Sequence, residues 1–518
     1  MFKKYFDNRF IILYTIPFFI GSLTTLSFQP FNITIINFIV LPIFFYLIIY
    51  VNKKSKSIYR KKPYKINLFV LGLLFGFGFY LSGISWITNS LTFEENFKIL
   101  IPFALIFIPL FLSIFMAINI LIIGPFLKPN FSSIALFSGS LAFSDFIRSK
   151  ILTGFPWNSW AYSTSWANEL LQILNMVGFH SYNIFIITLF TLPVIIFFNV
   201  KLLKKVVFLT SGLLIILGLY IYGNYVINQN DNLLNETNDK VFVKIISPNF
   251  ELEYGLSEEK IKKRLRQLIR YSSPDEDKKT LFIWPEGVFS GYSYKEILVF
   301  KEMISKSFSK DHFIVFGINV LDINSGKFYN SMLIVNNDFE IVQRYNKRKL
   351  VPFGEFLPFE DILNNFGLKK ITEGHGSFLR GNKNNNLKIE EINILPLICY
   401  EVIFTDLIQK SDNTNIIINI SEDGWFGKSV GPNQHFAKSI FRAIENNTYL
   451  LRSTNKGVSA IIDNKGNIIK QLNRNEAGNI EYDVPLIKSN KIKNDLIFFI
   501  LLITYLSIFL IYKKENAK

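Results

Sequence analysis

The spacing of apolar segments is the strongest constraint on how this chain can fold. Blocks of about 20 mostly apolar residues recur as far as position 228, and this is the length that an α-helix needs to cross a bilayer. A polar stretch follows, and one more apolar block lies near the C-terminus. With 50% hydrophobic and 19% charged residues and 54 phenylalanines, the chain is too apolar for an ordinary soluble protein. The sequence therefore predicts a membrane protein with a separate polar domain.

About eight membrane helices are predicted from these blocks. They are Phe10 to Phe28, Ile33 to Val51, Ile66 to Ile87, Ile99 to Leu127, Ser132 to Ile147, His180 to Val200, Val206 to Val226 and Asp495 to Tyr512. The first is not a secretory signal, because no small-residue cleavage site follows it. The predicted domains are a membrane domain of about seven helices over residues 1–228, a polar domain over 229–493, and a C-terminal helix with its tail over 494–518.

The positive charge of the chain is placed where membrane topology uses it. Lysine and arginine outnumber aspartate and glutamate by 56 to 40, a formal net charge of +16. Many of these cations flank apolar segments, as in Lys53 to Lys65, Lys201 to Lys205 and Lys513 to Lys514. By the positive-inside rule these loops and both termini are cytoplasmic, and the polar domain is periplasmic in a bacterium. A nucleic-acid partner is therefore not expected.

Two features of the membrane region have alternative interpretations. The glycines of Leu71 to Gly78 have the small-xxx-small spacing of close helix packing, and no strand or lysine supports a phosphate loop there. The aromatic stretch Thr153 to Trp160 fits either an anchor at the membrane interface or a lipid contact. Asp145 and Arg148 precede it, and we expect them to pair with each other or with a lipid headgroup, because charge in hydrocarbon is costly.

From Lys240 onward, short apolar runs alternate with helical patterns. The predicted strands are Val241 to Ile246, Leu281 to Trp284, Phe313 to Ile318, Ser331 to Val335, Glu340 to Arg344, Ile392 to Ile398, Ile416 to Ile420 and Tyr449 to Arg452. The predicted helices are Glu258 to Tyr271, Tyr294 to Phe308 and Gln434 to Glu445. Continuously apolar strands that alternate with helices indicate buried sheets covered by helices, which is an α/β layered domain.

Three reactive side chains follow apolar strands of this domain: Glu286, Lys347 and Cys399. Ligands of α/β domains collect where strands end. A carboxylate that accepts the thiol proton makes Cys399 a nucleophile, and Glu286 is the candidate base. Lys347 and the amide of Tyr400 are candidates for stabilising an oxyanion. Taken singly, each side chain also fits a structural role, as a buried apolar thiol, a strand-end carboxylate or a surface lysine; only their combination favours catalysis.

Several motifs resemble one family. They are Trp284-Pro-Glu-Gly, Tyr345-x-Lys-x-x-Leu-Val-Pro-Phe-Gly-Glu355, Ile398-Cys-Tyr-Glu401, Trp425-Phe-Gly427, His435 and Arg442-Ala-Ile-Glu445, with Gln29-Pro-Phe31, Gly76-Phe-Gly78, Trp86 and Gly154-Phe-Pro-Trp157 in the membrane region. Over nearly its whole length the chain resembles the bacterial apolipoprotein N-acyltransferases, membrane enzymes whose periplasmic domain belongs to the nitrilase (carbon-nitrogen hydrolase) superfamily. The resemblance implies a nitrilase-like αββα sandwich on a membrane bundle.

The resemblance also implies residue roles and a reaction. Glu286, Lys347 and Cys399 match the catalytic triad, and Glu355, Tyr400 and Glu401 match supporting residues, although Glu355 also fits a structural ion pair. His435 and Arg442 are expected in the scaffold. The implied reaction is ping-pong: Cys399 takes an acyl chain from a phospholipid and passes it to the N-terminal amine of a diacylglyceryl-modified apolipoprotein. No cofactor is implied, and the four scattered histidines do not have metal-ligand spacing.

The chain departs from the family pattern at two positions. Glu422 in Ser421-Glu-Asp-Gly-Trp425 stands where the family usually has asparagine, which adds a charge near the active face. Asp145 stands where the family more often has glutamate. Neither departure changes the triad.

Two other functions remain open from the sequence. A membrane-anchored nitrilase-type amidase would use the same catalytic residues and deliver the thioester to water, but a single anchor would serve such an enzyme. A non-catalytic scaffold or transporter would have no reason to keep Glu286, Lys347 and Cys399 at strand ends.

Overall fold

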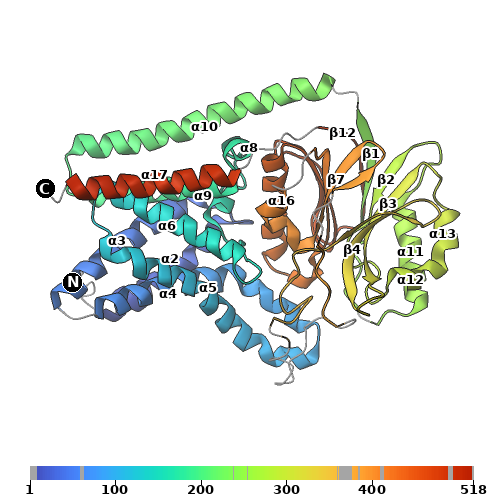
Figure 1. Cartoon of the computed structure of the whole chain (residues 1–518), viewed down its shortest axis with the longest axis horizontal. Helices are drawn as coiled ribbons and strands as arrows, with labels where there is room; N and C mark the ends of the chain where they lie inside the picture. The colour runs from blue at the N-terminus through green and yellow to red at the C-terminus, as the bar shows by residue number, and fades with distance from the viewer. Residues whose placement is uncertain are drawn as a thin grey trace. The chain divides into compact units, whose positions relative to one another are not determined.

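The computed structural model describes residues 9–58, 63–236, 239–253, 255–358, 360, 376–382, 386–408, 413–487 and 494–515. The chain divides into two compact units. The first contains Met1–Val226 and Lys493–Lys518, and the second contains Ile227–Ile492 (Figure 1).

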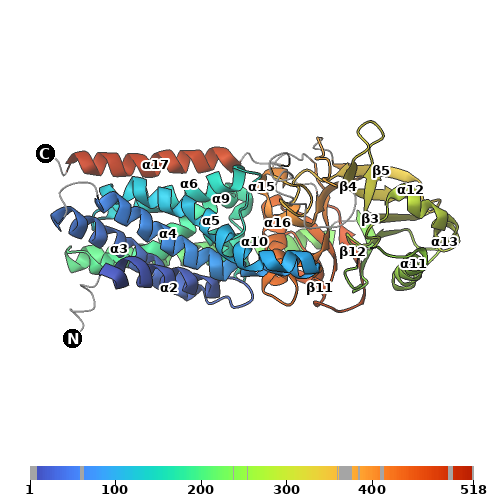
Figure 2. The same cartoon turned by 90° about the horizontal axis from the view of Figure 1, so that it is seen from below.

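The first unit is helical, as predicted. Its longer helices are α2 (Ile16–Leu23), α3 (Asn37–Ile58), α4 (Pro63–Ile84), α5 (Ile101–Ile123), α6 (Phe131–Lys150), α9 (Phe179–Thr191), α10 (Leu202–Glu236, which continues into the second unit) and α17 (Asn494–Glu515) (Figures 1 and 2). In the described part of the chain, 6 helical stretches are long and apolar enough to cross a membrane: Thr34–Lys54, Lys65–Thr92, Glu95–Phe126, Phe179–Phe197, Leu202–Asn230 and Asp495–Tyr512.

Two of the predicted membrane segments are helical but are not among these 6. The first predicted segment forms a shorter apolar stretch, Ile11–Ser27, composed of a π-helical turn, α2 and a 3-10 turn. The segment Ser132 to Ile147 lies in α6, which is rich in serine and carries Asp145, Arg148 and Lys150. The expected number of about eight membrane helices therefore remains a prediction.

The glycines of α4 serve helix packing, as their spacing predicted. A Cβ atom on Gly76 would lie 2.8 Å from the Ser113 Cβ of α5, and one on Gly78 would lie 2.1 Å from the Phe18 oxygen of α2. No side chain fits at either position without moving the neighbouring helix, so these glycines let α4 approach α5 and α2 closely.

The aromatic stretch after α6 is tied to the interior of this unit. Trp157 and Trp160 are almost fully buried, and Trp160 stacks on Phe79 with a centroid distance of 5.1 Å. Arg148 pairs with Asp145 at 2.9 Å and also donates to the Phe155 carbonyl oxygen. The expected pairing of Asp145 with Arg148 is confirmed. The two buried tryptophans form part of the packing of the unit, which favours neither of the two interpretations of this stretch, an interface anchor or a lipid contact.

The second unit contains two six-stranded sheets packed face to face. Their strand orders are β12-β1-β2-β3-β4-β5 and β11-β10-β9-β8-β7-β6. The strands are β1 (Lys240–Ser247), β2 (Thr280–Ile283), β3 (His312–Leu321), β4 (Phe328–Val335), β5 (Ile341–Asn346), β6 (Leu387–Ile389), β7 (Ile392–Ile398), β8 (Ile416–Glu422), β9 (Tyr449–Asn455), β10 (Ser459–Ile462), β11 (Ile468–Leu472) and β12 (Gly478–Pro485). In each sheet three central strands are parallel, namely β1-β2-β3 and β7-β8-β9.

Helices cover the outer faces of the two sheets, so the layered arrangement that was predicted is observed. Apolar side chains of both sheets, such as Ile283 and Ile418, form one core between them. A second core joins the outer face of the first sheet to α11 (Glu258–Ser272), α12 (Tyr294–Ile297) and α13 (Lys301–Ser305). Helix α16 (Gly431–Asn446) lies on the outer side of the other sheet (Figure 1). The predicted helix Tyr294 to Phe308 is thus broken into short pieces.

Candidate active site

The three predicted catalytic residues follow the ends of β2, β5 and β7. Cys399 comes directly after β7 and has a φ of +49°, in the left-handed region that few residues other than glycine adopt. This sharp turn lifts the thiol out of the sheet. The Ser453 hydroxyl of β9 lies 2.8 Å from the Ile246 carbonyl oxygen and 3.1 Å from that of Ile283, either of which can accept its hydrogen, so it joins the carboxyl ends of parallel strands from the two sheets. The ends of β2 and β7 therefore lie at the same edge of the sandwich.

Lys347 is a buried cation between two carboxylates. Its Nζ donates to Glu355 Oε1 at 2.8 Å and lies 3.5 Å from Glu286 Oε1, and its side chain is 1% exposed. Burial alone would lower the pKa of Lys347, but the charges of Glu286 and Glu355 raise it above its ordinary value. The ammonium group therefore keeps its proton and acts as a fixed positive charge.

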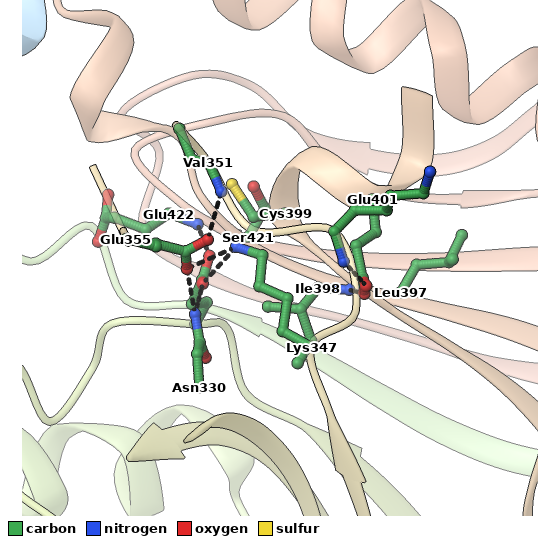
Figure 3. Close-up of polar contacts among 12 residues, drawn as sticks. Asn330, Lys347, Val351, Glu355, Leu397, Ile398, Cys399, Glu401, Ser421 and Glu422 are labelled. Carbon is green, nitrogen blue, oxygen red and sulfur yellow. Dashed lines mark hydrogen bonds and ion pairs between the residues drawn. The ribbon is translucent and has the colours of Figure 1, made fainter. Parts of the chain in front are cut away.

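Asn330 of β4 completes this cluster, and the sequence interpretation missed it. Its Nδ2 donates to Glu286 Oε1 at 2.8 Å and to Glu355 Oε1 at 2.7 Å. Glu355 Oε2 accepts from the Val351 amide, so this carboxylate is held from both sides (Figure 3). Asn330 and its neighbour Ser331 are the two polar residues between the aromatic and apolar residues of Phe328–Val335, and this interruption was the available signal.

Cys399 is held mainly as a neutral thiol. Burial and the nearby charge of Glu286 raise its pKa above the ordinary value, while Lys347 lowers it. A thiol of this kind becomes a nucleophile only as its proton moves to a base.

Glu401 ties the lysine segment to the cysteine turn. Its Oε1 accepts hydrogen bonds from the Tyr345 hydroxyl at 2.9 Å and from the amides of Arg348 and Lys349 at 2.7 and 3.0 Å. Its Oε2 accepts from the Ile398 amide at 2.9 Å. Burial raises the pKa of Glu401 above its ordinary value. One carboxylate thus fixes the residues next to Lys347 and Cys399.

Glu401→Gln is expected to lower acyl transfer about 10- to 100-fold and to destabilise the protein by roughly 1–3 kcal/mol, because the new amide group would face a buried backbone donor. Steady-state acylation and thermal unfolding in detergent measure the two effects. Glu391→Gln is the matched control, since the Glu391 side chain is 96% exposed. If the two variants behave alike, Glu401 does not hold the site.

A charged network lies below the nucleophile. The Asp423 carboxylate contacts His435 Nδ1 at 3.0 Å and Arg452 Nη2 at 2.8 Å. His435 Nε2 lies 3.2 Å from the Cys399 carbonyl oxygen, and burial lowers the pKa of His435. Arg442 pairs with Glu445 at 3.1 Å within α16. The His435 ring therefore supports the backbone of Cys399 through its carbonyl oxygen.

Glu422, which departs from the family pattern, lies beside the candidate base. Its amide donates to Glu286 Oε2 at 3.2 Å. Its carboxyl oxygens accept from the Gly424 amide at 2.8 Å and from Asn455 Nδ2 at 2.7 Å. Burial, together with the negative charges of Glu286 and Asp423, raises the pKa of Glu422 to about 8. The side chain therefore carries a proton at neutral pH and avoids a second charge next to Glu286.

This proton makes stability depend on pH. Because the pKa of Glu422 is higher in the folded than in the unfolded protein, its stabilising contribution is full below the unfolded value and is lost as the pH rises through about 8. Relative to the wild type, Glu422→Gln should gain about 2–3 kcal/mol in stability between pH 6 and pH 9. Unfolding free energies of both proteins, measured from pH 6 to pH 9, test this pH dependence of stability. Parallel curves for the two proteins would show that Glu422 is ionised throughout.

Metal ligation is not indicated by the described residues, among which no three His, Cys, Asp or Glu side chains gather as ligands. One of the four histidines, His375, lies outside the described residues.

Comparisons with known proteins cover both units. Residues 20–192 match the family described as "Apolipoprotein N-acyltransferase N-terminal domain", and residues 259–493 match the family described as "Carbon-nitrogen hydrolase". A Rickettsia typhi protein named apolipoprotein N-acyltransferase is 31% identical over 478 residues, which are 91% of this chain and 91% of that protein. One of the same name from Rickettsia prowazekii is 32% identical and covers 80% of this chain and 82% of its own length. Among solved structures, a CN-hydrolase superfamily protein from Xanthomonas campestris aligns with 48% of this chain and 91% of its own at 14% identity, with a TM-score of 0.35.

Proposed function

The chain belongs to the apolipoprotein N-acyltransferase family and is a bacterial membrane protein that N-acylates lipoproteins, and from this premise we propose how it does so. Cys399 carries the acyl group as a thioester, Glu286 is the general base, and Lys347 is the electrostatic stabiliser. The observation that supports these roles is the cluster in which Lys347 lies between Glu286 and Glu355. The charges of Glu286 and Lys347 both act on the Cys399 thiol at the shared edge of the two sheets.

The first half-reaction loads the enzyme. Glu286 accepts the Cys399 proton, and the thiolate attacks an ester carbonyl of a membrane phospholipid. The oxyanion that forms is stabilised by Lys347 and by the Tyr400 amide, the next backbone donor after the nucleophile. When the C–O bond breaks, the glyceryl oxygen takes the proton from Glu286. A lysophospholipid leaves, and Cys399 holds the acyl chain.

The second half-reaction delivers the acyl chain. The N-terminal amine of a diacylglyceryl-cysteine attacks the thioester, and Glu286 takes a proton from the amine. The C–S bond then breaks, and the proton passes from Glu286 to the leaving sulfur to restore the Cys399 thiol. The product is an amide, and the ping-pong cycle closes. Glu355 supports this proton transfer indirectly, because it fixes Lys347 and shares Asn330 with Glu286.

The nature of the substrates explains why the catalytic domain is attached to membrane helices. Both substrates are anchored in lipid, and moving an acyl chain into water costs about 0.8 kcal/mol per CH₂. A catalytic domain attached to the bilayer at both of its ends meets them by lateral diffusion. In this proposal the domain over residues 229–493 is periplasmic and both termini are cytoplasmic, as the positions of the lysines favour.

Incubation with labelled phospholipid and a synthetic diacylglyceryl-cysteine peptide separates this function from that of an amidase. The expected product is N-acyl peptide with one lysophospholipid released per acyl chain transferred. Release of free fatty acid without N-acyl peptide, in the presence of saturating peptide, would contradict the proposal. A peptide with an acetylated N-terminus is the matched control and should receive no acyl chain.

A further inference from the structure

His435 of α16 contacts the carbonyl group of the nucleophile itself. The ring is fully buried, and its Nε2 lies 3.2 Å from the Cys399 carbonyl oxygen. A carbonyl oxygen can only accept a hydrogen bond, so the hydrogen of this contact belongs to Nε2. This partner assigns the tautomer of His435: its Nε2 donates to the backbone of Cys399.

The other side of the ring is held by a buried ion pair. Nδ1 lies 3.0 Å from Asp423 Oδ1 and 3.0 Å from Arg452 Nη2, and Arg452 Nη2 also donates to Asp423 Oδ2 at 2.8 Å. Nδ1 can accept from the guanidinium group when the ring is neutral or donate to the carboxylate when it is charged, so Nε2 keeps its hydrogen in both states. Phe426 packs near the ring with a centroid distance of 5.3 Å. Buried side chains therefore set the direction of the Nε2–H group.

The carbonyl group that His435 holds belongs to the peptide unit between Cys399 and Tyr400. This peptide bond is trans, so the unit is planar and its C=O and N–H groups point in opposite directions. The unit can turn only as a whole. A hydrogen bond that fixes the Cys399 carbonyl oxygen therefore also fixes the direction of the Tyr400 amide hydrogen, which is a candidate oxyanion donor of the proposed reaction.

We propose that His435 is a positioning residue for oxyanion stabilisation: its Nε2–H holds the Cys399 carbonyl group so that the Tyr400 amide faces the oxyanion of each tetrahedral intermediate. Donors that are aimed before the charge develops need no reorganisation during the reaction. No proton moves to or from His435, and no covalent bond to it forms or breaks. This inference rests on the proposed roles of Cys399 as nucleophile and of the Tyr400 amide as oxyanion donor.

Glutamine and asparagine at position 435 separate this role from a purely structural one. The side-chain nitrogen of glutamine reaches about as far as Nε2 of histidine, whereas that of asparagine reaches only about as far as Nδ1. His435→Gln can therefore still donate to the Cys399 carbonyl oxygen, and His435→Asn cannot. Both variants lose the imidazole ring, so they share the damage to its packing.

Two reactions of Cys399 are compared in each variant. Acylation by 4-nitrophenyl butyrate, followed as a burst of nitrophenolate, passes through an oxyanion, whereas alkylation by iodoacetamide forms none. His435→Asn should slow acylation about 10- to 100-fold and leave alkylation within about twofold of the wild type, and His435→Gln should recover most of the acylation rate. Cys399 is the only cysteine of the 518 residues, so alkylated thiol is always this one.

His312→Asn is the matched control. His312 is another fully buried histidine whose ring contacts backbone carbonyl oxygens, but it is the first residue of β3, at the end of the strand away from its carboxyl end. This variant should leave both rates unchanged. Thermal unfolding shows which variants are folded. If His435→Asn is not, His435→Met takes its place, because methionine matches glutamine in length and has no donor.

The outcomes separate this inference from the proposed function. Unchanged acylation in His435→Asn, equal losses of acylation and alkylation, or a loss of acylation that a folded His435→Gln does not recover would overturn the role of His435. A wild type that reacts with the nitrophenyl ester but takes no acyl chain from phospholipid would contradict the proposed function and leave this comparison valid. A wild type without a burst would contradict Cys399 as the nucleophile and overturn both proposals.

Discussion

Cys399→Ala and Cys399→Ser are expected to lower acyl transfer by at least about 10³-fold, because no other residue can take over the covalent step. The chain has no second cysteine, and a serine hydroxyl at this position would be a far weaker nucleophile. Both variants should also form no hydroxylamine-labile acyl-enzyme from phospholipid. Steady-state transfer to a diacylglyceryl peptide and gel detection of the labelled acyl-enzyme measure the two effects.

The fold should tolerate both substitutions. The Cys399 side chain is only partly buried and lies at the rim of the core between the sheets, so the expected change in unfolding free energy is within about 1 kcal/mol. Inactivity with normal unfolding would assign the loss to chemistry. A Cys399→Ser variant that transfers acyl chains at the wild-type rate would show that the thioester route is wrong.

Lys347→Met is expected to have an effect of similar size. Removal of one oxyanion donor alone costs about 10²- to 10³-fold in rate, and the variant also loses the cation that favours the thiolate. Two buried carboxylates, Glu286 and Glu355, are then left facing one amide of Asn330 without a positive charge. An uncompensated buried charge destabilises a protein by about 3–5 kcal/mol.

The pH dependence of the stability of Lys347→Met identifies the cause of its destabilisation. Without Lys347 the two carboxylates repel each other with no cation between them, and a proton on one of them relieves this repulsion. The stability deficit of Lys347→Met relative to wild type should therefore be smaller at pH 5 than at pH 8. Lys279→Met is the control, since Lys279 forms an ion pair with Glu390 in which both side chains are more than half exposed. A deficit that does not change with pH would mean that the carboxylates are not the cause.

The sequence predicted which strands end in reactive side chains better than it predicted which of these strand ends lie close together in the fold. Glu286, Lys347 and Cys399 could be recognised because each follows a predicted apolar strand. Two strand ends lie at the same edge only if the order of strands in the sheets places them there. Local sequence patterns do not predict the order of β1 to β12. Asn330 was not assigned a role for this reason: it lies in a strand that looks like core, and its partners, Glu286 and Glu355, lie in segments that follow two other strands.

The strands that were missed show a second limit. Strand β6 has three residues, and β12, Gly478–Pro485, alternates polar with apolar residues at the edge of its sheet. Such strands are stabilised by pairing with a neighbour, since β12 pairs with β1 along its whole length. A strand of three residues such as β6 is too short to show a pattern, whereas the alternation in β12 is a strand signal that the sequence interpretation missed. The membrane helices were easier to predict, because each apolar block carries its own signal.

Intact-protein mass spectrometry of the purified enzyme after exposure to phospholipid, without acceptor peptide, tests the central claim most directly. The proposed mechanism predicts one added acyl chain per protein, located on Cys399 by peptide mapping, removed by neutral hydroxylamine and transferred to a diacylglyceryl peptide when the peptide is added. Full transfer activity in an enzyme that never carries an acyl adduct, or an adduct on another residue that the peptide discharges, would contradict it.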